Sequence, residues 1–242
     1  MGGDFDPFLH EQESDNPGHD SWSPGCRLAV FALASTSIVS LLVEFYGVCS
    51  MRAFTLAISL PALAGLLGWA LWDRAIGSQR LWRGIVVGSV AGLVAAFGYD
   101  IFRLPFVFAR DLGIDRVVPP LPLFKVFPRF GAMILGQPLV QSVYAPLTQL
   151  VGWAYHSSNG LTFGLMYLAL VSDASRRQWA WAVVFAVGLE LGMRLTPYPR
   201  FFGVALAPRF VVVTVAAHLV FGVVMGLSAL GLSRLLRPSV YR

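Results

Sequence analysis

Residues 154–164 read Ala-Tyr-His-Ser-Ser-Asn-Gly-Leu-Thr-Phe-Gly, and residues 216–226 read Ala-Ala-His-Leu-Val-Phe-Gly-Val-Val-Met-Gly. Both stretches have the spacing His-x3-Gly-x3-Gly, and both lie inside hydrophobic runs that are long enough to cross a bilayer. Residues four apart are neighbours on one face of an α-helix, so each histidine begins a row of glycines. Because glycine rows let membrane helices approach closely, the pattern predicts a helix bundle with both imidazoles directed into its interior.

The composition of the whole chain favours a membrane protein. Of its 242 residues, 56% are hydrophobic and only 13% are charged, with a mean hydropathy of +0.67. A soluble domain carries roughly 25% charged residues, so we expect the lipid bilayer to be the main partner. The net charge of +5 comes from seventeen arginines and Lys125, which lie mostly at the ends of apolar runs. This distribution is typical of membrane anchors and does not indicate a nucleic-acid partner.

Six apolar runs have about the 20 residues that are needed to cross ~30 Å of hydrocarbon. They cover residues 28–49, 53–72, 82–103, 148–171, 178–195 and 209–232. The predicted fold is therefore all-α, a polytopic membrane bundle of six transmembrane helices over residues 26–238 that pack through rows of small residues. Residues 1–25 are polar and acidic and lack Lys and Arg, so we expect a disordered tail there.

Residues 104–147 differ from the rest of the chain. They hold seven of the fifteen prolines, together with aromatic and basic residues. The stretch 131–147 is apolar, but Gln137, Pro138 and Pro146 argue against a full span. We predict an interfacial or re-entrant segment that caps one face of the bundle. A seventh helix is the alternative, and it would invert the orientation of everything after it.

Five ionisable side chains lie inside the predicted spans, each on a different helix. They are Glu44, Asp100, His156, Glu190 and His218. Because consecutive helices run in opposite directions, all five are predicted to lie in the same leaflet, next to residues 104–147. Charged groups in a bilayer are costly and usually face the bundle interior or a cavity. The predicted buried polar layer comprises Glu44, Asp100, Arg103, Asn159, Glu190 and Arg194, with the two histidines beside it.

Local pairing is the alternative explanation for this layer. Arg103 follows Asp100 by three residues and Arg194 follows Glu190 by four, so each carboxylate has a cation within reach on its own helix. The two histidines begin at equal depth on helices that enter from the same face. We therefore expect them to approach within ~10 Å of each other, near Asp100 or Glu190, through close packing of their glycine rows.

Three functions are compatible with these residues. The first is a small transporter or proton-coupled permease with Glu44, Asp100 and Glu190 as proton or cation sites. The second is a structural or assembly protein whose polar layer only fixes helix packing. The third is a divalent metal or haem site at His156 and His218.

Enzyme activity is the less favoured class. The chain has no Walker motif, no His-Glu-x-x-His, no Gly-x-Ser-x-Gly and no paired cysteines, so no catalytic residue is assigned. The sequence Ala217-His218 followed by glycines is similar to the last catalytic helix of rhomboid proteases. Those enzymes need a Gly-x-Ser-Gly nucleophile motif, which is absent here, and this excludes the protease. A homo-oligomer is compatible with the sequence.

Three motifs carry a resemblance over roughly residues 80–235. They are Tyr99-Asp100-x-x-Arg103-x-Pro105, Tyr155-His156-x-x-Asn159-Gly160-x-x-Phe163-Gly164 and Ala217-His218-x-x-x-Gly222. Together they resemble a group of uncharacterised bacterial multi-pass membrane proteins with about six helices. The resemblance implies the fold and a bacterial cytoplasmic membrane, but no chemistry. We expect both termini in the cytoplasm, although the Lys and Arg residues divide nine to nine between the two sides.

The topology can be tested with the two cysteines, Cys26 and Cys49, which bracket the first apolar run. If that run is one transmembrane helix, the two thiols lie on opposite membrane faces. A membrane-impermeant thiol reagent applied to intact cells is expected to modify one cysteine and spare the other, as read by mass spectrometry. Modification of both without permeabilisation would contradict the first span.

Overall fold

The computed structural model describes residues 22–172, 174 and 179–236, and within these all regular structure is helical. Six long segments are α1 (Pro24–Phe45), the continuous helix Met51–Ile76, α4 (Arg80–Val107), α6 (Pro146–Val171), α7 (Ala180–Arg194) and α9 (Pro208–Leu235). The continuous helix comprises α2 (Met51–Phe54), the π-helix η2 (Thr55–Ser59) and α3 (Leu60–Ile76). Two short helices are α5 (Val126–Leu135) and α8 (Tyr198–Phe201).

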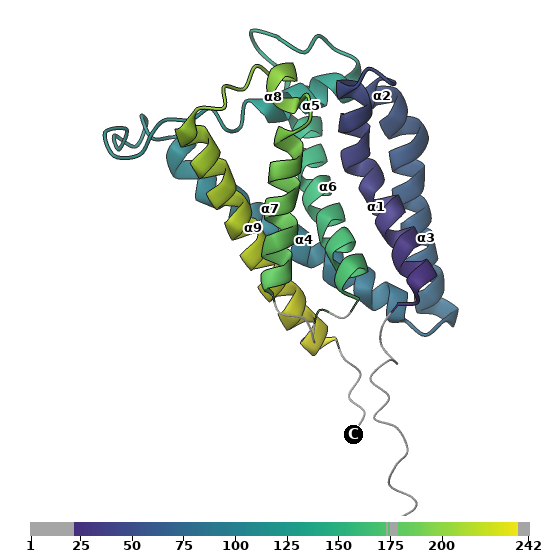
Figure 1. The fold of residues 1–242 in the computed structure, drawn as a ribbon. Helices are drawn as coiled ribbons and strands as arrows, with labels where there is room; N and C mark the ends of the chain where they lie inside the picture. The colour runs from purple at the N-terminus through teal and green to yellow at the C-terminus, as the bar shows by residue number, and fades with distance from the viewer. Residues whose placement is uncertain (1–21, 173, 175–178, 237–242) are drawn as a thin grey trace, which may run out of the picture.

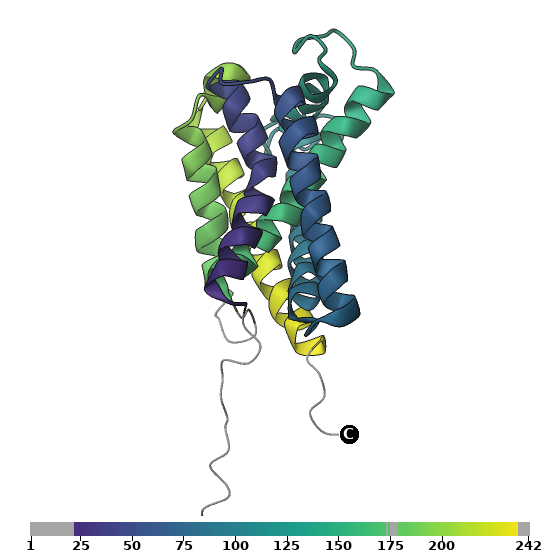
Figure 2. The same cartoon turned by 90° about the vertical axis from the view of Figure 1, so that its right-hand side faces the viewer.

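The long segments lie side by side and run alternately up and down (Figures 1 and 2). The short helices α5 and α8 and the turn between α1 and α2 lie together at one end, which we call the α5/α8 end (Figure 1). The first residue of α1 and the last residue of α9 lie at the opposite end. Helix α4 packs against both α6 and α9, while α6 also contacts α1 and α5, and α7 packs against α9.

Within the described residues, four helices are long and apolar enough to cross a membrane, rather than the six that the sequence predicts. They are Pro24–Phe45, Met51–Ile76, Arg80–Val107 and Pro208–Leu235. The other two predicted spans do form helices, α6 and α7, but each falls short for its own reason. The middle of α6 carries His-Ser-Ser-Asn at residues 156–159, which lowers its hydropathy. Helix α7 has only 15 residues and rises ~22 Å, less than the ~30 Å hydrocarbon core.

Prolines determine where several helices begin. Pro24, Pro146 and Pro208 occupy the first turns of α1, α6 and α9, where a missing N–H costs no hydrogen bond. Helix α1 thus begins inside the stretch that the sequence predicts as a tail. Trp22 just before it is buried, and its indole Nε1 donates to the Arg80 carbonyl at 3.2 Å. The predicted disorder of residues 1–21 lies outside the described residues.

The segment between α4 and α6 contains one short helix. Helix α4 continues past the predicted end at residue 103 and through Pro105 to Val107. Helix α5 has ten residues and rises ~15 Å, about half of the hydrocarbon core. It ends at Gly136, which has a φ of 69°, the left-handed conformation that glycine adopts readily. Helix α5 packs against the first turns of α6 at the α5/α8 end.

The glycine rows form close helix contacts, but they do not join α6 to α9. On α6, a Cβ at Gly164 would lie 2.0 Å from the Gly88 carbonyl oxygen, so this row packs against α4. On α9, a Cβ at Gly222 would lie 2.5 Å from the Cα of Val183, so that row packs against α7. The sequence-based expectation that the two rows face each other is therefore wrong. The α6 row meets the glycines of α4, whereas the α9 row lies against the backbone of residues 179–183.

The α4–α6 contact can be tested with Gly92→Ala. A Cβ at residue 92 would lie 2.1 Å from the Gly160 carbonyl oxygen, a backbone atom that cannot move without shifting the helix. We expect overpacking to cost about 1–3 kcal/mol, seen as a lower melting temperature in neutral detergent. Gly65→Ala is the control because nothing lies within 4 Å of its added Cβ. Equal melting temperatures for the two variants would contradict the contact.

Candidate functional site

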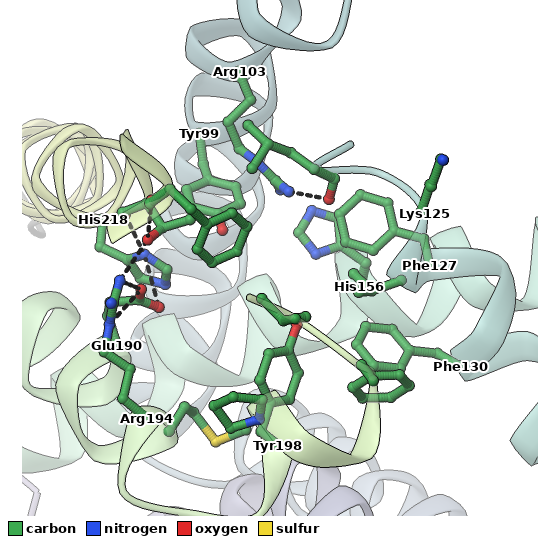
Figure 3. A pocket seen from close by; sticks show the side chains of 18 of the residues that line it. Tyr99, Arg103, Lys125, Phe127, Phe130, His156, Glu190, Arg194, Tyr198 and His218 are labelled. Atoms are coloured by element: carbon green, nitrogen blue, oxygen red, sulfur yellow. Dashed lines mark hydrogen bonds and ion pairs between the residues drawn. The ribbon is translucent and has the colours of Figure 1, made fainter. Parts of the chain in front are cut away.

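A cavity of about 500 Å³ lies between the helices at the α5/α8 end (Figure 3). Its walls come from α4, α6, α7 and α9, and α5, α8 and the residues before α9 close its end. This volume is in the range that holds a drug-sized ligand. The ionisable side chains that line it are Tyr99, Arg103, Lys125, Arg129, His156, Glu190, Arg194, Tyr198 and His218. Several residues of the predicted polar layer thus meet around one space.

The first polar group joins α4 to α6. His156 Nε2 lies 2.9 Å from Asp100 Oδ2 and 3.1 Å from Oδ1. An ionised carboxylate only accepts hydrogen bonds, so Nε2 is the nitrogen that carries the proton toward Asp100. The imidazole stacks on the ring of Phe127 from α5, with centroids 4.2 Å apart and planes inclined by 24°. The carboxylate and the aromatic ring together determine the orientation of this histidine.

Arg103 shares Asp100 with this histidine. Its side chain is only 4% exposed, and Nη1 lies 3.5 Å from Asp100 Oδ1. Nη2 donates to the Leu123 carbonyl in the segment that follows α4. The guanidinium carbon also lies 4.6 Å from the ring centre of Tyr99, with Phe124 at 5.0 Å and Phe127 at 5.3 Å. Cation–π attraction of this kind contributes about 0.5–2 kcal/mol per contact.

The second polar group joins α7 to α9. Glu190 Oε1 accepts hydrogen bonds from Arg194, from Nε at 3.1 Å and from Nη2. The same Nη2 donates to Thr214 Oγ1 on α9 at 2.5 Å. His218 Nδ1 donates to the Thr214 carbonyl at 2.8 Å and lies 3.4 Å from Glu190 Oε2. Because Nδ1 carries this proton, Nε2 is the nitrogen of His218 that can take up another proton from the cavity.

Tyr99 on α4 contacts both imidazoles. Its ring centre lies 6.0 Å from that of His156 and 4.9 Å from that of His218 (Figure 3). The two imidazole centres are therefore at most about 10.9 Å apart, the sum of these two distances. Each histidine pairs with a different carboxylate, the first with Asp100 and the second with Glu190. The site thus has two histidine–carboxylate pairs in place of one convergent cluster.

This division bears on the predicted metal site. Among the residues that the structure describes, no three His, Cys, Asp or Glu side chains come together in a way that could hold a metal ion. The Tyr99 ring contacts both imidazoles, and within these residues the two imidazoles do not share a common partner that could be a metal ligand. Divalent metal or haem binding at His156 and His218 remains a prediction from the sequence, and the geometry adds no third ligand to it.

Two other residues of the predicted layer have structural partners. Glu44 does not line the cavity, and its Oε2 accepts the Met51 backbone N–H at the start of the next helix. Asn159 reaches the edge of the cavity, and its Oδ1 accepts a hydrogen bond from Ser37 Oγ at 2.6 Å. The nearby Tyr155 hydroxyl donates to the Ser37 carbonyl at 2.9 Å. These bonds hold α1 against α6.

Sequence reasoning missed four residues that line the cavity, Tyr99, Lys125, Arg129 and Tyr198. Tyr99 lies next to Asp100, and this adjacency was the available signal. From the sequence, Lys125 and Arg129 indicate only the orientation of the chain in the membrane, although their segment is predicted to lie near the polar layer. Arg129 Nη1 donates to the Phe202 carbonyl at 2.7 Å and so joins α5 to the end of α8. Burial raises the pKa of the Tyr198 phenol above its usual range, so this hydroxyl stays protonated.

No family model, curated protein or solved structure matches this chain. The resemblance to bacterial multi-pass membrane proteins therefore stays a prediction from the three motifs. Any function has to be argued from the geometry of the cavity.

The Asp100 ion pair can be tested by replacement with Asn, which keeps the shape but removes the charge. Arg103 would then be buried without a carboxylate, and we expect a loss of about 3 kcal/mol of stability in detergent. The exposed Asp111→Asn is the control. The double variant Asp100→Asn with Arg103→Met is expected to recover part of the loss. Additive losses in the double variant would contradict the ion pair.

Proposed function

We propose that this protein is a multi-pass membrane protein, a bundle of six membrane helices, that binds a small solute in its cavity and carries it together with protons. The four apolar helices support a position in the membrane. In this proposal α6 and α7 are the remaining two membrane helices: α6 packs against α1, α4 and α5, and α7 packs along α9. This would make the protein a small proton-coupled permease.

The observation that carries the proposal is the space between the two polar groups. If ionisable residues only locked the helices together, we would expect their side chains to pack against one another without a gap. Instead, His156 and Glu190 line opposite sides of a cavity of about 500 Å³. Ionisable side chains that line a cavity inside a membrane bundle usually mark a substrate or ion path.

The histidine–carboxylate pairs supply the means of proton exchange. Imidazole is the side chain that gains and loses protons most readily near neutral pH. His218 presents Nε2 for a proton, while its Nδ1 is held by the Thr214 carbonyl. Its neighbour Glu190 lies 3.4 Å away, so a proton taken up by this imidazole has a carboxylate beside it. A bound solute that changes the charge of the cavity would therefore change the proton occupancy of this pair.

A structural or assembly role is the second candidate, and a specific observation favours it. Glu190 accepts hydrogen bonds from Arg194 on its own helix, and Arg194 also donates to Thr214 Oγ1 on α9, so this network alone can hold α7 against α9. Glu44 likewise fulfils a helix-capping role. A purely structural protein would tolerate loss of the carboxylate charge wherever the hydrogen bonds are kept.

Transport can be tested in proteoliposomes that contain a trapped pH-sensitive dye. We expect external short- and medium-chain carboxylates to acidify the lumen faster than in protein-free liposomes, which report passive entry of the neutral acids. Glu190→Gln is expected to lower the protein-dependent rate about tenfold or more, because the amide cannot stabilise a proton on His218.

The control is Glu44→Gln, which removes a carboxylate from the same end of the bundle but outside the cavity. This variant is expected to transport like the wild type, since an amide oxygen can still accept the Met51 N–H. Equal rates in proteoliposomes and protein-free liposomes would contradict transport of these acids. Equal rates for wild type and Glu190→Gln would contradict proton coupling through this pair.

A further inference from the structure

The charges around the cavity are not balanced. Its lining includes the cations Arg103, Lys125, Arg129 and Arg194 but only one carboxylate, Glu190. Asp100 does not line the cavity, but it contacts both Arg103 and His156 and brings the number of nearby carboxylates to two. Four fixed positive charges against two negative ones leave an excess of positive charge in a region of low dielectric. Such an excess favours an anionic occupant.

Arg103 has the least complete environment among these cations. It is 4% exposed, and its Nε and Nη1 are buried with no hydrogen-bond acceptor among the described residues. The nearest carboxylate oxygen, Asp100 Oδ1, lies 3.5 Å from Nη1, whereas this carboxylate approaches His156 Nε2 to 2.9 Å. A buried charge that is only partly compensated is costly. An anion in the cavity would supply the missing negative charge.

Lys125 and Arg129 add to this potential without any carboxylate partner. Lys125 is exposed and has no ion pair or side-chain hydrogen bond among the residues that the structure describes. It lies at the rim, with its ammonium directed away from His156 (Figure 3). Arg129 donates to the Phe202 carbonyl and has no ion pair within the described part of the chain. The positive side chains therefore extend from inside the cavity to its rim.

The rest of the cavity wall is mostly apolar and includes six phenylalanine side chains. The apolar residues include Phe130 of α5, Phe202 and Leu206 of the segment between α8 and α9, and Phe210 at the start of α9. Phe163 of α6 and Phe221 of α9 also form part of the wall. A small hydrated anion such as phosphate would leave this apolar surface unfilled, whereas an alkyl or aromatic group would cover it.

We propose that the cavity binds an amphiphilic anion, with its carboxylate or phosphate head near Arg103 and its apolar part against the apolar side chains of the wall. This proposal rests on the proposed function only because it concerns the same cavity. It adds the chemical class of the substrate. The head group could belong to a free acid or to a membrane lipid, because both present the same charge to the guanidinium.

The test is binding of radiolabelled decanoate to the purified protein in neutral maltoside detergent, measured by scintillation proximity. We expect saturable binding that decyl phosphate displaces. Decanol and decyltrimethylammonium, which keep the chain but lack the negative charge, are not expected to displace it. Acetate and inorganic phosphate, which keep the charge but lack the chain, are expected to compete at least about tenfold more weakly.

Two variants test lining cations that are not fully buried. Lys125→Gln and Arg129→Gln are each expected to weaken decanoate binding about three- to tenfold, since each removes one favourable charge interaction. Arg116→Gln is the matched control, because Arg116 is an exposed cation of the same connecting segment that does not line the cavity. The control is expected to bind decanoate like the wild type.

Competition by lipids in nanodiscs distinguishes a lipid head group from the head group of a free acid. Displacement of decanoate by phosphatidylglycerol, but not by phosphatidylcholine, would assign the site to an anionic lipid; no displacement by either would assign it to free acids. Binding that is equal for decanoate and decyltrimethylammonium, or unchanged in both cavity variants, would overturn the proposal. Equal competition by acetate would overturn the amphiphile assignment in favour of a small anion.

The experiments can refute either proposal without refuting the other. Anion-selective binding without protein-dependent proton movement would keep the ligand class and remove transport. Protein-dependent transport with no preference for anions would remove the ligand class and keep transport.

Discussion

The structure depends on the burial of one guanidinium inside an apolar helix bundle. Arg103 is 4% exposed on α4, and a charge in this position has to be compensated by its neighbours. The compensation comes from three directions: Asp100 on the same helix, the Leu123 carbonyl in the following segment, and the rings of Tyr99, Phe124 and Phe127. The segment after α4 is thereby held over the end of the bundle, and with it the α5 side chains that close the cavity.

The same requirement links the two sides of the cavity. Asp100 compensates the charge of Arg103 only in part, because His156 lies closer to the same carboxylate. Glu190 is similarly shared between Arg194 and His218 on the other side. Tyr99 contacts both imidazoles, so a change in the charge of one pair can reach the other through a single side chain. An arrangement with shared carboxylates responds to an added charge more readily than one in which every ion has its own partner.

Close backbone packing is what makes room for this polar centre. The contact between Gly92 on α4 and Gly160 on α6 brings the helices together just below His156 and Asp100. Beyond it toward the α5/α8 end, Ala96, Tyr99 and Arg103 of α4 and His156 of α6 line the cavity. The glycine contact therefore contributes indirectly to the site, since it holds together the two helices that carry these side chains.

The sequence alone determined the number and approximate limits of the long helices, because apolar run length and prolines act locally along the chain. It also determined that Glu44, Asp100, His156, Glu190 and His218 lie toward one end, since alternating helix direction follows from the order of the runs. The apolar runs overstated the membrane-spanning character of α6, which carries the polar residues 156–159, and of α7, which has only 15 residues.

Only the tertiary structure decided which helices meet. Every glycine row looks alike in sequence, so nothing local could show that the α6 row packs on α4 and the α9 row on α7. The same holds for the partners of the histidines, for the exclusion of Glu44 from the cavity, and for Lys125 and Arg129 at its edge. These features depend on the order of helices around the bundle, which is set by many long-range contacts at once and leaves no trace in the spacing of any single segment.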